Sequence, residues 1–548
     1  MPESPPLATA APQRLPTSSR LRKSFLLPIL LLAALLALAQ INQHLILASD
    51  NASYVVLAQA LATGRGYVMI NEPAAPAMNL YPPGYPLLLA GALQLSGAVA
   101  KPMQAIIAMK LVTVIFYLAC LPILYVLVQR RRGEATAALT TLLFAVNPPT
   151  LSLATEVLSE MPFVAFTLLT LLLMDCFDAA QRAARSARLL IAVALALAAA
   201  YYMRTAGMAI LAAVPLYLVL KRRIGAGVAL GAALVLAALP WFLRSSAPPT
   251  PETPFFARSY VHQVLALAPY SDQSATLLDL AGRVVANSLA YGARILPETM
   301  FPHLAWLGPL APVASAIIAL LVLLGFLIEI RSGLRASELA IAAYWLSLSL
   351  FVWVLGFRYV LVILPFAFLY LLVAVCWVGR APARFLSFAA RRPVSAHTTI
   401  LPLVLLVAAV LLLSALAVDV RRAERNLRLT RRQTLVEVYA GNLEWTRYLQ
   451  AASWIAENTP ANAVLMSRKP DLLYLLAERQ TVEYPYTQDG AILMSTIEHN
   501  AVSFILEDAF TWTRTTETYL IPAMHASAGD FALAYETPAP HTRVWKIR

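Results

Sequence analysis

The run SFLLPILLLAALLALAQINQHLIL (residues 24–47) is almost wholly apolar and follows a basic segment. An α-helix rises about 1.5 Å per residue, so about 20 such residues cross the roughly 30 Å hydrocarbon core of a bilayer. The run is too long for the core of a signal peptide and is interpreted as a retained membrane anchor. It is the first of a series.

Ten further apolar runs follow, which predicts a polytopic α-helical membrane protein with about eleven transmembrane helices. The predicted spans are 24–47, 103–128, 135–146, 161–177, 187–202, 208–220, 224–243, 306–328, 339–355, 359–378 and 400–418. Composition agrees, because 60% of the 548 residues are apolar and 13% are charged, which excludes a soluble cytosolic enzyme. The three cysteines lie in apolar runs, so neither a disulfide framework nor a cysteine-based metal site is expected.

The net charge of +13 is interpreted as an excess of Lys and Arg in the loops on one side of the membrane. No nucleic-acid partner is expected. With a cytoplasmic N-terminus, every inside segment carries Lys or Arg, whereas the outside loop 147–160 carries two acids and neither of these. We therefore expect a multi-pass protein of a bacterial inner membrane with a periplasmic C-terminal domain. The basic run 421–432 opposes this orientation, although long translocated domains largely escape the rule.

The predicted domains are a disordered cytoplasmic segment at 1–23, a transmembrane domain at 24–418 with outside loops at 48–102 and 244–302, and a periplasmic domain at 419–548. The last carries 14 Lys and Arg against 15 Asp and Glu, as a soluble domain would. A long amphipathic helix is predicted over 423–458, strands at 463–467, 481–484, 501–507, 531–536 and 543–547, and helices at 471–478 and 492–499. This alternation indicates a small α/β domain, and no nucleotide-binding or hydrolase motif follows its strands.

Two acids stand at outside ends of predicted spans. Asp50 follows the first span and is an interfacial solvated acid, the cap of a helix at 53–62, or a general base. Glu160 opens the fourth span, where a carboxylate suits the first helical turn, but two acids at one membrane face could also bind a substrate or a metal ion. Glu156, one helical turn away, is a third candidate.

Arg204, Arg244 and Arg358 stand at outside ends of spans in apolar surroundings. Snorkelling to the interface accounts for any one of them, but three near the acids favour a polar cavity that binds a phosphate. His303 could ligate a metal or contact substrate, or could be an ordinary interfacial side chain. No His and Asp cluster has metal-ligand spacing, so we expect no cofactor, although a divalent metal stays possible.

Several segments follow one another along the chain in a characteristic order. They are Asp50-x-x-x-Tyr54, Leu61-Ala-Thr-Gly-Arg-Gly-Tyr67, Tyr81-Pro-Pro-Gly-Tyr-Pro-Leu-Leu-Leu89, Ser159-Glu-Met-Pro-Phe163, Tyr202-Met-Arg-Thr-Ala-Gly207, Pro240-Trp-Phe-Leu-Arg244, Phe357-Arg-Tyr359 and Trp454-Ile-Ala-Glu-Asn-Thr-Pro460. This series resembles GT-C class glycosyltransferases that use polyprenyl-phosphate sugars, the group with the protein O-mannosyltransferases and the lipid A aminoarabinose transferase. The resemblance covers nearly the whole chain. It departs from the aminoarabinose transferases at Ser53 and Tyr81, where those enzymes have basic residues, so their donor-phosphate contacts and donor sugar are not carried over. Lipid A is not carried over as the acceptor either.

The resemblance implies an inverting transfer of a sugar from a polyprenyl-phosphate donor in the bilayer to an extracytoplasmic acceptor. Asp50 would be the base and Glu160 a second acid that orients a substrate. The donor phosphate would bind Arg358 first, with Arg204 and Arg244 as further candidates. The remaining residues expected in the substrate cavity are Tyr54, Arg65, Tyr67, Tyr81, Tyr85, Glu156, His303 and Tyr359.

Two other functions stay open. A transporter or flippase for lipid-linked sugars would need the same arginines, together with inside-facing polar groups and two alternating halves, and we expect neither from the sequence. A non-catalytic assembly protein would tolerate amides at Asp50 and Glu160.

Overall fold

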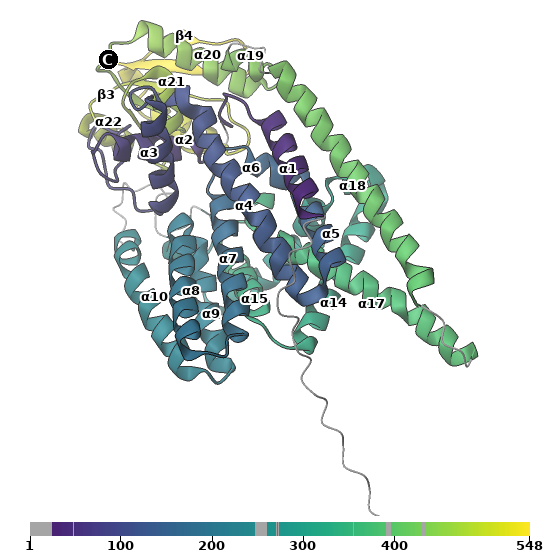
Figure 1. The fold of residues 1–548 in the computed structure, drawn as a ribbon. Coiled ribbons are helices and arrows are strands. Elements are labelled where there is room, and N and C mark those ends of the chain that lie inside the picture. The colour runs from purple at the N-terminus through teal and green to yellow at the C-terminus, as the bar shows by residue number, and fades with distance from the viewer. Residues whose placement is uncertain are drawn as a thin grey trace, which may run out of the picture.

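A bundle of long helices carries a small sheet domain at one end (Figure 1). The computed structural model describes residues 25–47, 49–246, 260–269, 271, 273–354, 356–390, 396–429 and 434–548, so the predicted N-terminal segment 1–23 lies outside it. The long helices are α1 (Leu26–Gln40), α4 (Ile106–Arg132), α5 (Glu134–Ala145), α7 (Glu160–Asp178), α8 (Ala183–Met203), α9 (Met208–Leu220), α10 (Ile224–Ser245), α14 (Ala311–Ser332), α15 (Ala336–Leu350), α17 (Leu364–Ala390) and α18 (Ala396–Leu429). Each overlaps one of the eleven predicted spans.

The chain is a multi-pass membrane protein. Within the described ranges, five helical stretches are long and apolar enough to cross a bilayer, namely Pro102–Arg132, Glu160–Asp178, Ala183–Met203, Ile224–Ser245 and Pro302–Ser332. The pair Glu134–Ala145 and Pro148–Ala154, bent by 62°, would make a sixth. Large apolar side chains such as Ile115 and Leu195 point outward from these helices, where a bilayer would cover them. The number eleven stays a prediction.

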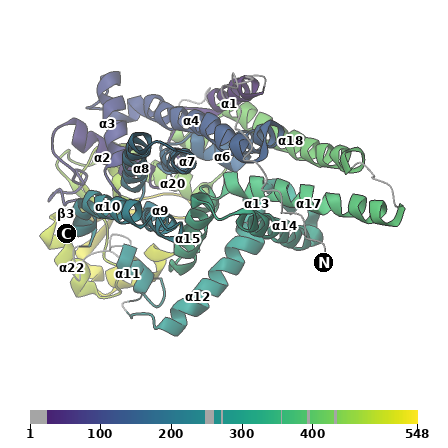
Figure 2. The same ribbon diagram turned by 60° about the horizontal axis from the view of Figure 1, so that its bottom comes forward.

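Further helices, outside the predicted spans or at their ends, connect those of the bundle. They are α2 (Asn51–Ala62), α3 (Gly84–Ser96), η1 (Pro102–Ala105), α6 (Pro148–Ala154), η2 (Thr205–Gly207), α11 (Tyr260–Leu265), α12 (Leu277–Ala290), η4 (Tyr291–Ile295), α13 (Leu296–Met300), η5 (Pro302–Leu310) and α16 (Phe357–Val360). Figure 2 shows α12 projecting from the side of the bundle. Its start is fixed by Thr276 and Asp279, whose side chains each bind the other residue's backbone N–H.

The sheet domain is the predicted α/β unit. Its strands β1 (Val464–Met466), β2 (Thr481–Val482), β3 (Val502–Glu507), β4 (Phe531–Glu536) and β5 (Arg543–Ile547) lie in the order β2-β1-β3-β5-β4. β1 is parallel to β2 and β3, whereas β5 is antiparallel to β3 and β4. The helices are α19 (Leu435–Val438), α20 (Leu443–Asn458), α21 (Pro470–Ala477), α22 (Gly490–His499), η6 (Thr516–Leu520), α23 (Ile521–His525) and η7 (Ala528–Asp530). All five predicted strands are present, while η6 and α23 were not predicted.

The long helix predicted over 423–458 is wrong. α18 ends at Leu429, and α19 and α20 are separate helices. Each has its own start signal, because the Thr434 side chain accepts a hydrogen bond from the backbone of Glu437, and the Asn442 side chain accepts one from Trp445. These caps satisfy N–H groups that a continuous helix would use internally.

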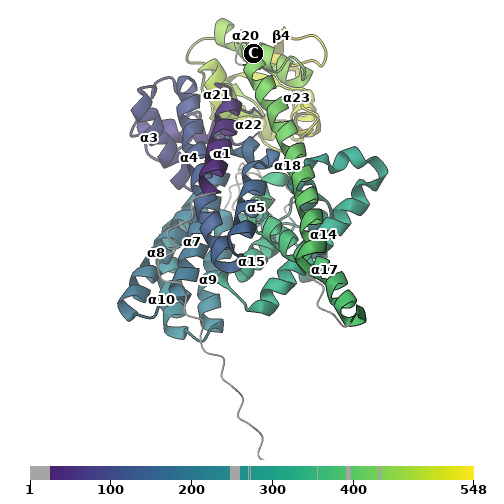
Figure 3. The same cartoon turned by 45° about the vertical axis from the view of Figure 1, so that its right-hand side comes forward.

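The predicted domain boundary at 419 falls inside α18, which runs beside α1 into the sheet domain (Figure 3). Asn426 of α18 donates from its amide to the carbonyl oxygens of Ala39 and Ile41, at 3.0 and 2.9 Å. The Gln40 amide donates to Asp419 at 3.4 Å. One helix thus ties the sheet domain to the start of the bundle.

Charged side chains are also paired within the bundle, around the C-terminus of α4. Arg131 donates twice to the Asp175 carboxylate, at 2.9 and 3.0 Å, and Arg132 lies 2.7 Å from Glu329. Each guanidinium finds its carboxylate on a neighbouring helix, which compensates for its removal from water.

Candidate active site

The backbone segment after α1 positions Asp50. α1 ends at Gln40 rather than at the predicted 47, and the chain continues without helical structure toward α2. Lys110 of α4 donates to the carbonyl oxygen of His44 at 2.7 Å, and the Tyr439 hydroxyl donates to that of Leu45 at 3.2 Å. Side chains from a transmembrane helix and from the sheet domain thus fix the approach to Asp50.

Asp50 forms an ion pair with Arg358, which lies in α16. The guanidinium Nη2 is 3.0 Å from the carboxylate Oδ2, and the Asp50 side chain is 30% exposed. Oδ1 has no hydrogen-bond partner among the described residues. Burial raises the pKa of Asp50, but the charges of Arg358, Lys469 and Arg204 outweigh burial, so its pKa lies below the usual value for aspartate. The carboxylate is ionised at neutral pH.

Glu160 connects two arginines. It is the first residue of α7, and its Oε1 lies 2.7 Å from Nε of Arg358 and 2.9 Å from Nη1 of Arg204. Its side chain is 3% exposed, and its second oxygen, Oε2, is buried without a hydrogen-bond partner. Because buried carboxylate oxygens are normally satisfied, Oε2 is a ready acceptor for a group that enters the site.

Arg204 leaves the end of α8 in an extended conformation that turns its side chain to this cluster. Its guanidinium donates to the Ser159 hydroxyl at 3.1 Å and lies over the Tyr359 ring, 5.3 Å from the ring centroid. The Ser159 hydroxyl is also 2.9 Å from the Tyr54 hydroxyl. Residues from α2, α7, α8 and α16 therefore meet at one place.

The sheet domain adds a third cation. Lys469, immediately before α21, donates to the carbonyl oxygen of Ser49 at 3.2 Å, next to Asp50. Two residues further on, Asp471 accepts a hydrogen bond from the Ser53 hydroxyl of α2. Neither Lys469 nor Ser159 was identified from the sequence. No local pattern marks Lys469, whereas Ser159 directly precedes the Glu160 that was singled out.

Arg244 is not part of the cluster. Its guanidinium donates to the carbonyl oxygens of Tyr67 and Met78, at 2.7 and 3.0 Å, and lies over the Tyr67 ring. These contacts hold the two sides of the loop between α2 and α3 together. Arg244 therefore positions this loop, and its guanidinium is already engaged.

Four of the predicted tyrosines pack together near the ion pairs. The Tyr54 ring lies 5.1 Å from the rings of both Tyr81 and Tyr85. The Tyr67 hydroxyl donates to the carbonyl oxygen of Tyr81 at 2.7 Å. These residues join α2 and α3 in an aromatic wall beside the ion pairs.

Three other predicted residues have separate surroundings. Glu156 pairs with the buried Lys110 at 3.1 Å, where it supports the segment that leads to Asp50. The His303 ring packs against Trp306 with centroids 4.6 Å apart. Arg65 is exposed.

Three acids and three cations thus gather where the bundle meets the sheet domain, namely Asp50, Glu160, Asp471, Arg204, Arg358 and Lys469. The cationic groups can bind an anion next to the ionised carboxylate of Asp50. Over the described residues, no group of three His, Cys, Asp or Glu side chains is placed to hold a metal ion.

Known proteins resemble this chain in part of its sequence and in its fold. Residues 77–241 match the model of the family described as dolichyl-phosphate-mannose-protein mannosyltransferase. A comparison with curated protein sequences found no significant match.

Solved structures match over nearly the whole chain. ArnT from Cupriavidus metallidurans, bound to undecaprenyl phosphate, matches 96% of this chain and 98% of its own at 15% identity, with a TM-score of 0.54. The oligosaccharyltransferase AglB from Archaeoglobus fulgidus, in complex with an inhibitory peptide and a dolichol-phosphate, matches 97% of this chain and 75% of its own at 11% identity, with a TM-score of 0.54. The resemblance noted in the sequence is confirmed, and the chain has the fold of the GT-C class of membrane glycosyltransferases.

Proposed function

We propose that this protein is an inverting glycosyltransferase that moves one sugar from a polyprenyl-phosphate carrier to an acceptor hydroxyl. The acceptor oxygen attacks the anomeric carbon, and the bond from that carbon to the phosphate oxygen breaks. The acceptor proton passes to the carboxylate of Asp50, and the polyprenyl phosphate leaves with the bonding electrons. One sugar is transferred and one proton is released.

The observation that carries the proposal is the Asp50 carboxylate. One oxygen is held by Arg358, the other has no partner among the described residues, and the group is partly exposed. A general base must be unprotonated and within reach of the hydroxyl that it deprotonates. Asp50 meets the first condition at neutral pH, and its free Oδ1 can meet the second.

The surrounding charge suits the leaving group. Arg204 and Arg358 are held by Glu160, and Lys469 by a backbone carbonyl, so the cations are in place before substrate binds. Preorganised positive charge stabilises the negative charge that develops on the departing phosphate. Arg358 contacts both acids and is the first candidate to bind that phosphate, and Glu160 positions the two arginines.

The remaining details of this proposal concern the membrane. We place the protein in a bacterial inner membrane with the sheet domain in the periplasm, so the acceptor would be an extracytoplasmic glycolipid, polysaccharide or protein. The ArnT and AglB structures each contain a polyprenyl-type phosphate, and that ligand class supports a lipid-linked donor here.

Lipid analysis tests the proposal directly. Cells without the protein, and the same cells with wild type or Asp50→Asn, would be extracted and examined for sugar-loaded polyprenyl phosphate by mass spectrometry. We expect the donor to accumulate in the deletion and Asp50→Asn strains but not with wild type, and its mass identifies the sugar. Full activity of an Asp50→Asn protein that inserts normally would refute the catalytic role, and unchanged lipids in every strain would favour a binding protein.

A further inference from the structure

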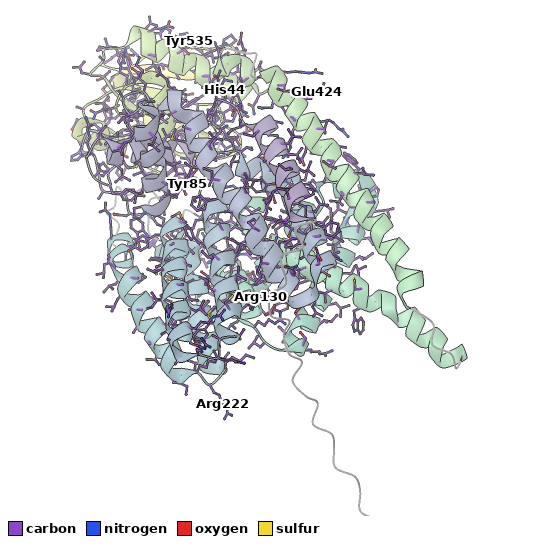
Figure 4. The ribbon with its side chains drawn as sticks, viewed as in Figure 1. His44, Tyr85, Arg130, Arg222, Glu424 and Tyr535 are labelled. Carbon is purple, nitrogen blue, oxygen red and sulfur yellow. The ribbon has the colours of Figure 1, made fainter. Side chains whose placement is uncertain are left out.

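A second site lies on the sheet domain, away from the ion pairs. One face of α20 and the β4 edge of the sheet enclose an open pocket of about 460 Å³. Its lining is formed by Val436, Arg447, Gln450, Ser453, Trp454, Glu457, Tyr535 and Pro538. The volume is within the roughly 300–1,000 Å³ of pockets that bind small ligands. In Figure 4, Tyr535 lies at the end of the molecule opposite Arg222.

The pocket is built by a regular feature of α20. Arg447, Gln450, Trp454 and Glu457 are spaced three or four residues apart, which puts them on one helix face. The opposite face of the same helix is buried in the core. Packing of the sheet domain therefore explains the buried face of α20 but does not use the face that lines the pocket.

The pocket also contains an aromatic platform. The Trp454 and Tyr535 rings are stacked, with centroids 5.1 Å apart and planes 10° apart. Tyr535 lies next to an irregularity in the pairing of β4 with β5, between Leu533 and Tyr535. Such bulges change the direction of a side chain on an edge strand, and here the Tyr535 ring packs against one face of the Trp454 ring.

Polar groups beside this platform have unused hydrogen-bonding capacity. Ser453 and Glu457 form no hydrogen bond or ion pair with the described residues. The Arg447 guanidinium donates to Gln450 at 3.0 Å and to the carbonyl oxygen of Ala539 at 3.5 Å, but its Nε is buried without a partner. Donors and acceptors thus surround an apolar surface, and the charges of Arg447 and Glu457 balance.

We propose that this pocket binds a neutral sugar ring of a glycan chain, as a second, non-catalytic site. One face of a pyranose presents C–H groups that pack on an aromatic ring, because the ring face is electron-rich. Its hydroxyls both donate and accept, which matches Arg447 on one side and Ser453 and Glu457 on the other. The charge balance disfavours a phosphate, and the open shape lets a chain extend beyond the bound ring. This inference does not depend on the proposed catalytic function.

Saturation-transfer NMR on the full chain in lipid nanodiscs tests the site. The probes are the hexasaccharides of glucose, mannose, galactose and N-acetylglucosamine, with nonaproline as a peptide that also packs on aromatic residues. We expect at least one hexasaccharide to bind with a dissociation constant on the order of millimolar. Its signal should fall at least tenfold in Trp454→Ala and several-fold in Glu457→Gln.

Two matched variants locate the binding. Trp512→Ala removes another tryptophan of the same domain, 48% exposed and outside the pocket, and should retain the signal. Asp50→Asn should also retain it if binding is separate from the ion-pair cluster. Glu457 is exposed, so its variant tests the site even if Trp454→Ala fails to fold. The proposal fails if no hexasaccharide binds, if only nonaproline binds, if the signal survives in Glu457→Gln, or if Asp50→Asn abolishes it.

Discussion

At the scale of single residues, Arg358 controls the ionisation of Asp50. Burial favours the neutral acid, and the adjacent guanidinium favours the carboxylate. Asp50 has a pKa below the ordinary value, so transfer should persist as pH falls and be lost only when pH reaches that low pKa. The fall in the transfer rate at low pH, the acidic limb of the pH–rate profile, therefore reports the environment of this one carboxylate.

Arg358→Gln should shift that acidic limb toward higher pH. Removing the guanidinium leaves burial, which raises the pKa of Asp50, opposed only by Lys469 and the more distant Arg204. The rate of sugar transfer would be measured between pH 3 and pH 9 with wild type and variant. Arg244→Gln is the control, because Arg244 contacts backbone carbonyls and not Asp50. An acidic limb that does not move in Arg358→Gln would contradict the proposed coupling.

The site was partly predictable at this scale. Asp50, Glu160, Arg204 and Arg358 each interrupt apolar sequence, and a charge at such a place requires a partner or a function. The sequence did not distinguish Arg244 from the other arginines, because its partners are backbone carbonyls of a loop that local sequence does not position. The pairing of Glu160 with both arginines required the three-dimensional fold.

At the scale of elements, the contact between α14 and α17 depends on Gly325. A Cβ at this position would lie 1.9 Å from the carbonyl oxygen of Tyr370, far inside contact distance. Because the obstacle is backbone, relief requires the helices to separate. Small residues allow such close approach between helices in membranes.

Gly325→Ala should therefore lower the thermal unfolding midpoint in detergent, with a cost of about 1–3 kcal/mol typical of overpacking. Gly91→Ala in α3 is the matched control, because nothing lies within 4 Å of a Cβ there. That variant should be neutral or stabilising by up to about 1 kcal/mol, since alanine is the better helix former. Equal midpoints for the two variants would show that α14 and α17 separate at little cost.

The secondary-structure elements were predicted best where the hydrophobic pattern and the length of a segment indicate the same kind of element. The five strands are short apolar runs between turns, and each was located within a few residues. The helix over 423–458 was mispredicted because polar residues continue its periodicity past two capping signals, at Thr434 and Asn442. The helix at η6 and α23 was missed because its buried face comes from contacts across the domain.

At the scale of the whole molecule, the sheet domain completes the ion-pair site. β2 is held against the loop between α2 and α3, which contains Asn71. The Asn71 backbone carbonyl accepts from the Thr481 backbone N–H at 2.6 Å, and the Asn71 side-chain amide donates to the Thr481 carbonyl oxygen at 3.1 Å. This docking brings Lys469 next to Asp50. The sequence could not predict that contact, because about 420 residues separate Lys469 from the Asp50 segment. No local pattern distinguishes Lys469 from the other charged residues of the sheet domain.

Lys469→Gln should raise the KM for the lipid-linked donor by about tenfold or more, because a hydrogen bond from a charged group contributes about 1.5–3 kcal/mol. Lys546→Gln is the control, since Lys546 is exposed on β5 in the same domain. The comparison uses initial rates of transfer from the donor identified by lipid analysis. If both variants have the wild-type KM, Lys469 has no role in donor binding.

The orientation of the molecule decides which compartment supplies the acceptor. The sheet domain and the loop between α9 and α10 lie at opposite ends of the bundle (Figure 1).

In a background with Cys120, Cys176 and Cys376 replaced by alanine, single cysteines would be placed at the exposed positions Ser495 and Lys221. Both would be treated in spheroplasts with a maleimide that does not cross membranes. We expect Ser495→Cys to react at once and Lys221→Cys only after permeabilisation, because the basic cluster Lys221 to Arg223 predicts a cytoplasmic loop. The reverse pattern would place Asp50 and the sheet domain in the cytoplasm, and an extracytoplasmic acceptor would then be impossible.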